Sequence, residues 1–318
     1  MLTPLVVIVG PTAVGKSKIA VEVAGKIDGE IVSADSMQVY RFMDIGTAKT
    51  RETERYTGDG KYIPHHLLDF KDPKESFSVA EFQKLAREKI EEIYRRGKLP
   101  MLVGGTGLYV RSVIDPYTFT ELEVDWEIRR RLKKQAAERG NLWLHRQLAE
   151  VDPVSAAKIH PNDLRRVIRA LEVYYRTGQP LSKSHRVGRE ENKNYRVCMI
   201  GLYMDRKKLY QRINQRVDEM IATGLVEEVR KLLEMGYSPQ LPALQGLGYK
   251  QIVGYLKGEY SLEEAIRLLK RDTRRFAKRQ LTWFRRDKRI RWFDVDVYSN
   301  IQPLVELIVG EIRRTLSL

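Results

Sequence analysis

The sequence predicts an α/β fold with a parallel sheet core, a helical insertion and basic C-terminal helices. Three observations support this class. An apolar run over residues 5–9 leads through a glycine-rich turn into a helical pattern, and strand-like runs followed by helical patterns recur before residue 110. The middle of the chain has a helical pattern, and the last third is basic. Because crossovers between parallel strands are right-handed, the successive strands are expected to share one sheet.

The first strand–turn–helix unit carries a phosphate-binding motif. Its residues fit the pattern G-x-x-x-x-G-K-[ST] at every fixed position: Gly10, Pro11, Thr12, Ala13, Val14, Gly15, Lys16 and Ser17. Glycines let successive amides turn toward an anion, and the N-terminus of the following helix (18–27) adds partial positive charge. We expect Lys16 to reach the outer phosphate oxygens and Ser17 to hold a magnesium ion, Mg2+. The core is therefore expected to be P-loop NTPase-like and to bind a di- or triphosphate.

The second strand, over residues 30–34, ends at a polar segment. Asp35, Ser36, Met37 and Gln38 follow it at the carboxyl edge of the sheet, where open α/β sheets bind ligands. Asp35 could be a magnesium ligand, a substrate-positioning group or a general base, or it could cap the next turn. Its position in the sequence does not separate these roles.

The third strand, over residues 99–103, runs into the glycine-rich segment Gly104–Tyr109. It is preceded by a helix that we expect to begin after Ser78, in a capping box with Glu81, and to end at Gly97. The strand ends in glycines and a threonine rather than an aspartate, so the metal-holding acid of ordinary P-loop enzymes is missing there. This argues against an ordinary ATPase or GTPase.

The sequence pattern changes between residues 116 and 195, where short helical patterns follow one another without a clear strand. One of them, over 162–176, has Asn162 as its expected N-cap and Gly178 just past its end. A strand over 196–203 then resumes the α/β pattern. We therefore expect a P-loop core formed by residues 1–115 and 196–318 and a helical insertion domain over 116–195.

The basic residues of the chain concentrate between positions 267 and 291. Lysine and arginine number 57 against 42 acidic residues, which gives a net charge of +15. Such an excess suits a polyanionic partner, because neutralised phosphates release counterions, although basic runs are often only solvated faces. Phe276, Trp283, Phe284 and Trp292 lie among the charges, where they could stack on bases or pack into the core. The density of the basic stripe favours contact with nucleic acid.

The composition is that of a globular protein without a membrane span. Hydrophobic residues make up 42% of the 318, and no apolar run approaches the roughly 18 residues that a span needs. The N-terminus leads directly into the first strand, which leaves no room for a signal peptide. The single cysteine, Cys198, fits a reducing compartment and a core position better than a nucleophile. We expect a cytoplasmic protein.

Several further motifs, in order, carry a resemblance to a known family. They are Ser33–Tyr40, Met43–Lys49, His65–Asp69, Gly104–Tyr109, His160–Asp163 with Arg165 and Arg166, Gly246–Lys250, and Ala277–Arg285. Together with the phosphate-binding turn they make the chain, over nearly its whole length, similar to bacterial tRNA dimethylallyltransferases (tRNA isopentenyltransferases). One departure is Thr50, where the family pattern has proline. His65 and His66 are interpreted as structural, because neighbours in an extended segment point to opposite faces.

The resemblance implies transfer of a dimethylallyl group from dimethylallyl diphosphate to the N6 amine of the adenosine 3′-adjacent to the anticodon, with release of pyrophosphate. Lys16 and Arg216 would stabilise the diphosphate, Asp35 would accept or orient the amine proton, and Thr106 would help position the base, which must be flipped out. Gln38 is the best candidate to read its edge. The residues expected to contact tRNA are Asp35, Ser36, Met37, Gln38, Thr106, Asp163, Arg165, Arg166, Gln245, Gly246, Leu247, Gly248, Tyr249 and Lys250. The enzyme is expected to be a monomer.

Two other classes of function fit parts of the sequence. A nucleoside or small-molecule kinase would use the same phosphate-binding turn for ATP and Asp35 as a base, and it would show no salt-sensitive affinity for RNA. A nucleic-acid-binding switch protein without transfer chemistry would keep its function after Asp35→Ala. A relative that prenylates free AMP is closer, but the basic C-terminal region favours tRNA.

Overall fold

The computed structural model describes residues 2–117, 119, 124–184 and 194–318. The chain divides into two compact units. The core unit comprises Met1–Ile114 and Lys193–Leu318, and the helical unit comprises Asp115–Asn192. Each unit has its own hydrophobic core.

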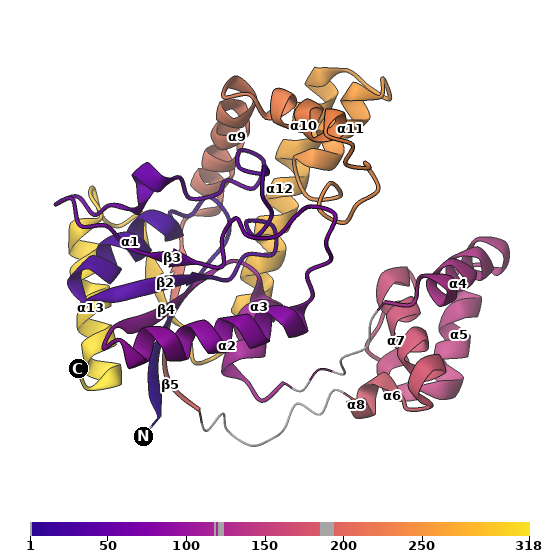
Figure 1. The fold of residues 1–318 in the computed structure, drawn as a ribbon, viewed down its shortest axis with the longest axis horizontal. Coiled ribbons are helices and arrows are strands. Elements are labelled where there is room, and N and C mark those ends of the chain that lie inside the picture. Colours follow the sequence, from indigo (N-terminus) through magenta and orange to yellow (C-terminus); the bar gives the residue numbers. More distant parts are fainter. Residues whose placement is uncertain (1, 118, 120–123, 185–193) are drawn as a thin grey trace. The chain divides into compact units, whose positions relative to one another are not determined.

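The core unit is built on a six-stranded sheet with the strand order β3-β2-β4-β1-β5-β6 (Figure 1). The strands are β1 (Thr3–Val9), β2 (Gly29–Ser33), β3 (His65–His66), β4 (Leu99–Gly104), β5 (Tyr195–Tyr203) and β6 (Arg291–Asp294). All of these pairings are parallel, and Val9 of β1 is in register with Gly104 on one side and Gly201 on the other. The segments that follow β1, β2 and β4 therefore leave the sheet at one edge. The predicted α/β class with a P-loop-like parallel sheet is confirmed.

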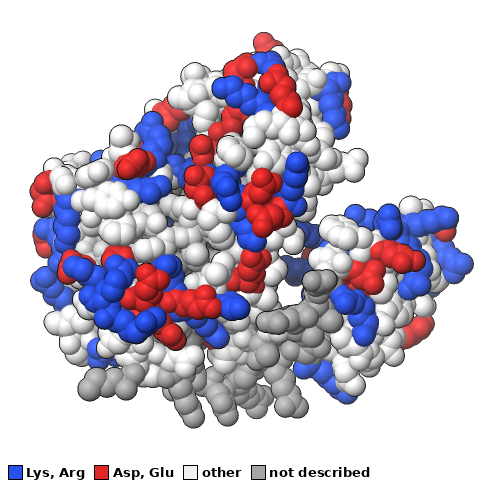
Figure 2. Space-filling model, in the orientation of Figure 1, with Lys and Arg blue, Asp and Glu red and all other residues white. Residues whose placement is uncertain are grey.

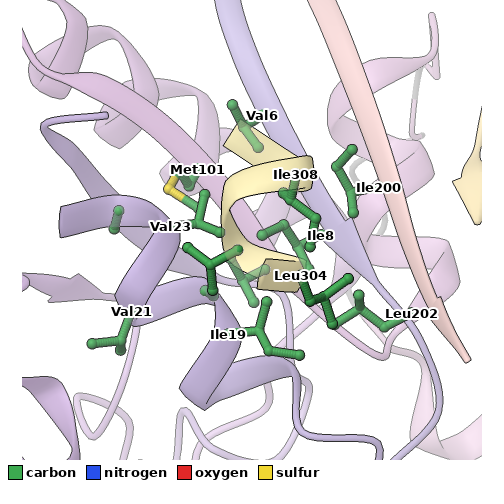
Figure 3. Close-up of a cluster of buried hydrophobic side chains, with 14 of the residues drawn as sticks. Val6, Ile8, Ile19, Val21, Val23, Met101, Ile200, Leu202, Leu304 and Ile308 are labelled. Carbon is green, nitrogen blue, oxygen red and sulfur yellow. The ribbon is translucent and has the colours of Figure 1, made fainter. Parts of the chain in front are cut away.

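Helices cover both faces of the sheet. On one face α1 (Lys16–Lys26) and α13 (Gln302–Leu316) bury an apolar cluster in which Ile19 and Ile308 pack over Ile8 of the central strand (Figure 3). On the other face α2 (Val79–Arg95) and α3 (Gly107–Ile114) pack over Val7 and Leu102. Ser78 caps α2 by accepting a hydrogen bond from the backbone of Glu81. The central strands are thus buried on both faces, as a parallel sheet requires.

A group of helices follows β5 and adds a third core. It comprises α9 (Arg206–Ala222), α10 (Leu225–Glu234), α11 (Tyr249–Leu256) and α12 (Leu262–Phe284) (Figure 1). Their apolar side chains enclose Val39, Tyr40 and Met43, which belong to the segment that leaves β2. A short 3-10 helix, η1 (Glu52–Arg55), completes that segment. The polar turn after β2 is therefore anchored from both sides, by the sheet and by the C-terminal helices.

The helical unit comprises α4 (Trp126–Arg139), α5 (Asn141–Val151), α6 (Pro153–Ala156), α7 (Leu164–Thr177) and α8 (Leu181–Ser184). The expected N-cap of α7 is wrong by one residue: Asp163, not Asn162, caps the helix by accepting from the backbone N–H of Arg166. A carboxylate at this end also suits the helix dipole. Inside the unit the buried Glu172 pairs with Arg129 and Arg169 at 2.9 and 2.8 Å.

The single cysteine and the adjacent histidines His65 and His66 occupy structural positions. Cys198 is buried in β5, where burial raises the pKa of its thiol to about 11, so the thiol is protonated and unreactive at neutral pH. His66 bonds to Glu30 at 2.7 Å through Nε2, and His65 bonds to the carbonyl of Ile63 at 2.8 Å through Nδ1. None of the helices in the described ranges has the length and apolar character needed to cross a membrane.

Candidate active site

The phosphate-binding turn connects β1 to α1 and requires glycine at two points. Gly10 passes so close to β5 that a Cβ there would lie 2.6 Å from the carbonyl oxygen of Leu202. Gly15, which precedes α1, has a φ of 99° with open space around it, so its backbone conformation and not its size demands glycine. Ala13 adopts a φ of 65° in the same turn. Such a curled backbone ending at a helix N-terminus directs amide N–H groups toward an anion.

Lys16 is the first residue of α1, directly after the turn, and has an unusual electrostatic environment. Its Nζ donates a hydrogen bond to the carbonyl of Pro11 at 2.7 Å. Burial lowers the pKa of Lys16 to about 7, the Asp35 carboxylate opposes that shift, and the Arg216 guanidinium adds to it. Because two cations and one carboxylate share this space, a bound anion would restore the full charge of Lys16. The next residue, Ser17, is exposed in the first turn of α1.

Asp35 has one of the roles that the sequence left open, that of capping the next turn. Its Oδ1 accepts hydrogen bonds from the backbone N–H groups of Met37, at 2.8 Å, and Gln38, at 3.2 Å, and so caps the turn after β2. The other carboxylate oxygen has no hydrogen-bond partner within the described part of the chain. Capping fixes the orientation of the carboxyl group, and the second oxygen remains able to accept a proton or hold a substrate group.

Thr106 joins the glycine-rich segment after β4 to the turn after β2. Its Oγ1 accepts a hydrogen bond from the backbone of Ser36 at 3.3 Å, and its own N–H donates to the carbonyl of Ala34 at 3.2 Å. Gly104 allows this approach, since a Cβ there would lie 2.2 Å from the Ala34 oxygen. Thr106 and Asp35, predicted from separate motifs, are therefore neighbours at one edge of the sheet.

Arg216 reaches the same edge from α9. It is partly buried, and burial lowers its pKa, whereas the carboxylates of Glu54 and Asp35 oppose that shift. Arg212, one helical turn earlier, is exposed. Of the two arginines, only Arg216 belongs to the group that contains Lys16 and Asp35. No cluster of three or more His, Cys, Asp or Glu side chains suited to a metal ion occurs among the residues that the structure describes.

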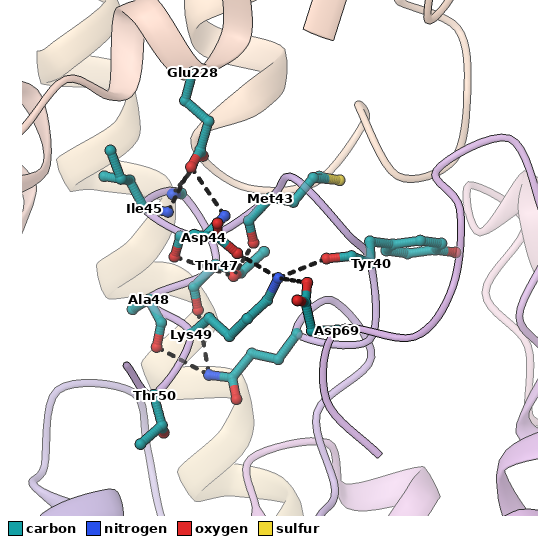
Figure 4. Close-up of polar contacts among 12 residues, drawn as sticks. Tyr40, Met43, Asp44, Ile45, Thr47, Ala48, Lys49, Thr50, Asp69 and Glu228 are labelled. Carbon is teal, nitrogen blue, oxygen red and sulfur yellow. Dashed lines mark hydrogen bonds and ion pairs between the residues drawn. The ribbon is translucent and has the colours of Figure 1, made fainter. Parts of the chain in front are cut away.

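The segment after β2 is held by a polar network that sequence reasoning missed (Figure 4). The buried Lys49 ammonium group binds the carboxylates of Asp44 and Asp69 and the carbonyl of Tyr40, the last at 2.7 Å. From α10, Glu228 accepts hydrogen bonds from three consecutive backbone N–H groups, those of residues 44–46, at 2.7–3.0 Å. The motif containing Lys49 was visible in the sequence, but nothing local to it indicates Glu228 as its partner.

Gln38 is fixed by this network. Its Nε2 donates to the carbonyls of Thr47 and Ala48, at 3.4 and 3.0 Å. With its amide nitrogen engaged, Gln38 can use its amide oxygen as an acceptor. Met37 is partly buried and lies against the turn that precedes α11, where a Cβ on Gly246 would be 2.4 Å from the methionine methyl group.

The residues of the segment Gln245–Lys250 differ in their exposure to solvent. Gln245 and Lys250 are exposed, whereas Gly246 and Leu247 are partly buried and Gly248 is buried. Tyr249 is fully buried, and its hydroxyl donates to Glu228 at 2.7 Å. The ring of Tyr249 therefore lies beneath the segment it supports, and the expected contact of this residue with tRNA stays a prediction.

In the helical unit the predicted tRNA-contacting residues lie at the start of α7. Arg165 and Arg166 are exposed, and Arg166 pairs with Asp163 at 3.3 Å. Asp163 also caps the helix, so its carboxylate has a structural role. The two arginines are the groups of this motif that remain suited to a phosphate backbone.

The basic stripe of α12 is partly neutralised within the protein. Lys270 pairs with Asp218 at 2.6 Å and Arg271 with Asp272 at 2.9 Å, and Figure 2 shows charges of both signs interspersed over the visible face of the core unit. The exposed cations without an acidic partner among the described residues include Lys278, Arg285, Arg286 and Lys288. Phe284 is buried, and Trp283 is partly buried against Gly107. Trp283 and Phe284 therefore pack within the protein. The exposed cations without an acidic partner among the described residues are suited to bind a polyanion.

Comparison with known proteins gives one consistent result. A model of the IPP transferase family matches residues 38–287, and a model of isopentenyl transferases matches residues 3–68. The tRNA dimethylallyltransferases of Carboxydothermus hydrogenoformans and Moorella thermoacetica are 56% and 54% identical, over 98% and 99% of this chain and 98% and 97% of theirs.

Solved structures agree. The tRNA isopentenylpyrophosphate transferase of Bacillus halodurans is 48% identical, with a TM-score of 0.71 over 99% of this chain and 98% of that one. A eukaryotic dimethylallyltransferase acting on tRNA is 30% identical, with a TM-score of 0.79 over 96% of this chain and 78% of that one. With a family model covering most of its length and relatives this similar from end to end, the chain belongs to the IPP transferase family.

Proposed function

We propose that this protein transfers a dimethylallyl group from dimethylallyl diphosphate to the N6 amine of the adenosine 3′-adjacent to the anticodon of tRNA, releasing pyrophosphate. The observation that carries the proposal is the meeting of Lys16, Arg216, Asp35 and Thr106 at one edge of the sheet. Two cations there suit a diphosphate, and a carboxylate with one unengaged oxygen suits an amine. The name of the relatives, tRNA dimethylallyltransferase, supports tRNA as the acceptor and dimethylallyl as the transferred group. The phosphate-binding turn and the two cations support a diphosphate as the donor.

The reaction exchanges a C–O bond for a C–N bond. As the bond between the dimethylallyl carbon and the diphosphate breaks, the leaving oxygen takes the electron pair, and the phosphate-binding amides, Lys16 and Arg216 stabilise the growing negative charge. The lone pair of N6 forms the new bond. Asp35 then accepts the proton that N6 loses, or orients the amine until water does. The turn-capping hydrogen bonds to Oδ1 hold the carboxylate in place for this step.

The flipped adenine would lie against the turn after β2. Gln38 presents its amide oxygen, which accepts a hydrogen bond from an amino group and would be repelled by the carbonyl of guanine. Contacts for RNA phosphates would come from Arg165 and Arg166 of the helical unit and from Gln245 and Lys250, before and on α11. The exposed cations on and just after the last turns of α12 would add to them.

Mg2+ is part of this proposal. The exposed Ser17 hydroxyl is an oxygen ligand of the type that magnesium prefers, and the described residues contain no cluster of protein ligands that would bind the ion by itself. We infer that Ser17 and the diphosphate oxygens would hold the ion, which when bound neutralises charge on the leaving group. The remaining expectations are a cytoplasmic protein, consistent with its one buried cysteine, and a monomer.

A three-arm transfer assay tests the function. Protein and Mg2+ are mixed in single turnover with labelled dimethylallyl diphosphate and an anticodon stem-loop carrying adenosine 3′ of the anticodon. A second arm offers AMP as acceptor, and a third offers ATP with a nucleoside. The proposal predicts label in the stem-loop and none in AMP. ATP consumption without transfer to RNA would instead identify a kinase.

A further inference from the structure

A single glutamine of α12 connects the two halves of the candidate active site. Gln280 is buried, with 6% of its surface exposed. Its Oε1 accepts a hydrogen bond from the backbone N–H of Thr12, in the phosphate-binding turn, at 2.9 Å. Its Nε2 donates to the carbonyl of Gly105, in the glycine-rich segment after β4, at 3.0 Å. One planar amide thus holds two loops that are far apart in the sequence.

The fit around this amide leaves little room for movement. A Cβ on Gly105 would lie 2.2 Å from Nε2 of Gln280, and a Cβ on Gly107 would lie 2.2 Å from the ring of Trp283, one turn further along α12. Ala277 and Phe284 anchor the same helix in two different hydrophobic clusters. The helix therefore lies directly on the glycine-rich segment, and Gln280 is wedged between it and the phosphate-binding turn.

The connection continues to the acceptor side of the site. Thr106 follows Gly105 and accepts a hydrogen bond from the backbone of Ser36, which is next to Asp35. An unbroken series of hydrogen bonds and peptide bonds therefore runs from Thr12 through Gln280, Gly105, Thr106 and Ser36 to the backbone of Asp35. At its first end lies the turn that would hold the diphosphate, and at its second end lies the proposed proton acceptor.

We infer that Gln280 is a positioning residue that sets the separation between the diphosphate-binding turn and the acceptor side of the site. The expected effect of Gln280 on kcat rests on the proposed function. Its role in holding the two loops together does not. The reaction needs the diphosphate carbon and the amine within bonding reach, and small misplacements of reacting groups carry large rate penalties. We call the two hydrogen bonds of Gln280, to Thr12 and to Gly105, the clamp. Loss of the clamp should lower kcat far more than it weakens binding of either substrate alone.

The chemistry of the clamp suggests the decisive variant, Gln280→Glu. A protonated carboxyl group has the same donor and acceptor as the amide, so it can serve both Thr12 and Gly105. An ionised carboxylate offers only acceptors, is repelled by the Gly105 carbonyl, and places negative charge beside the leaving pyrophosphate. The ratio of Gln280→Glu to wild-type kcat should therefore rise as pH falls, by up to about tenfold per pH unit above the pKa of the new group. Gln280→Ala should lose kcat by a factor that does not change with pH.

Two measurements separate positioning from general destabilisation. Ile308→Val, a core substitution in α13 remote from the clamp, should lower Tm and leave kcat unchanged. Hydrogen exchange of the Thr12 amide in the free protein should be faster in Gln280→Ala and unchanged in Ile308→Val, because only the first variant removes its acceptor.

The outcomes are distinct. Wild-type kcat in Gln280→Ala with unchanged Thr12 exchange would overturn the inference, as would a Gln280→Glu to wild-type ratio that is flat with pH. If the wild-type protein transfers no label at all, the proposed function fails, and the exchange measurement still decides whether Gln280 holds the two loops together.

Discussion

The ammonium group of Lys16, whose pKa burial lowers to about 7, lies within electrostatic reach of the Asp35 carboxylate, which opposes that shift. The first residue follows the phosphate-binding turn, and the second lies just after β2, at the end of the same βαβ unit. Their interaction links the group that would hold the leaving diphosphate to the group that would receive the amine proton. Because burial brings the pKa of Lys16 to about 7, the charge of this site changes with pH near neutrality.

The first prediction concerns the pH dependence of diphosphate binding. The folded pKa of Lys16 is below its ordinary value, so the side chain loses its proton as pH rises through about 7. A diphosphate binds the protonated form better, and its affinity should fall by up to about tenfold per pH unit above that value. Calorimetric titration with pyrophosphate between pH 6 and 9 measures this. Lys16→Met should bind weakly with a much flatter profile, and an equally steep profile in that variant would assign the effect to another group.

The second prediction separates the two functions of Asp35. Asp35→Asn keeps an oxygen to accept from Met37 and Gln38 but removes the basic carboxylate, so kcat should fall by about 10²–10⁴-fold with Tm near the wild-type value. Asp35→Ala also removes the cap and should lower both kcat and Tm. Single-turnover rates and thermal melts of the pair measure the difference. If the asparagine variant kept its rate, Asp35 would be a structural residue only.

The third prediction tests the support beneath the segment after β2. A methyl group at Gly46 would lie 2.6 Å from the ring of Tyr249, so Gly46→Ala should cost about 1–3 kcal/mol of stability and weaken tRNA binding by displacing the loop that holds Gln38. The matched control is Gly310→Ala in α13, where a methyl group meets open space. That helical substitution should stabilise the protein by about 0.5–1 kcal/mol and leave binding unchanged. Denaturant unfolding and filter binding measure both effects.

The fourth prediction is a pH dependence of stability. Burial acts to raise the pKa of Glu30, but hydrogen bonds from Arg96 and His66 outweigh it and hold the pKa below its ordinary value. A carboxylate with a depressed folded pKa stabilises the protein above its unfolded pKa of about 4.3, and this stability is lost as pH falls through the folded value. Glu30→Gln should be less stable than wild type at pH 7, and the gap should narrow below pH 4. Urea unfolding at pH 7 and below pH 4 measures the difference in unfolding free energy between the two proteins. A difference that does not change with pH would show that the charge of Glu30 does not contribute to stability.

The fifth prediction concerns the exposed arginines of α7. Reversing the charge of both Arg165 and Arg166 should weaken tRNA binding and reduce its salt dependence by about one unit of log–log slope per lost phosphate contact. The same change of net charge at the exposed Lys133 and Lys134 of α4 should have a smaller effect. Binding at several salt concentrations measures both. Equal slopes in the two variants would mean that only overall charge matters, and unchanged affinity would remove the start of α7 from the RNA surface.

The parts of the structure that the sequence predicts are those set by local pattern. The phosphate-binding turn, the strand before it and the placement of Asp35 at the sheet edge follow from short motifs whose backbone conformation depends on residues within the motif. The α/β class followed in the same way, because apolar strands and helical patterns alternate.

The parts that the sequence did not predict depend on contacts between distant segments. Glu228 lies more than 180 positions from the three amides it binds, and Gln280 lies 268 positions from Thr12. Tyr249 illustrates the related limit that a motif shows which residues occur together, but not which of them face the ligand and which support it from beneath. The error in the predicted N-cap of α7, Asn162 instead of Asp163, is only one residue. It arises because either side chain can accept the capping hydrogen bond.

The most direct test of the account is to map the modified nucleotide and its by-product together. An anticodon stem-loop is incubated to completion with the protein, Mg2+ and dimethylallyl diphosphate, then digested for mass spectrometry while released pyrophosphate is counted. The account predicts one dimethylallyl group on N6 of the adenosine 3′-adjacent to the anticodon, with an equal amount of pyrophosphate. A group on any other nucleotide, or modified RNA without matching pyrophosphate, would contradict it.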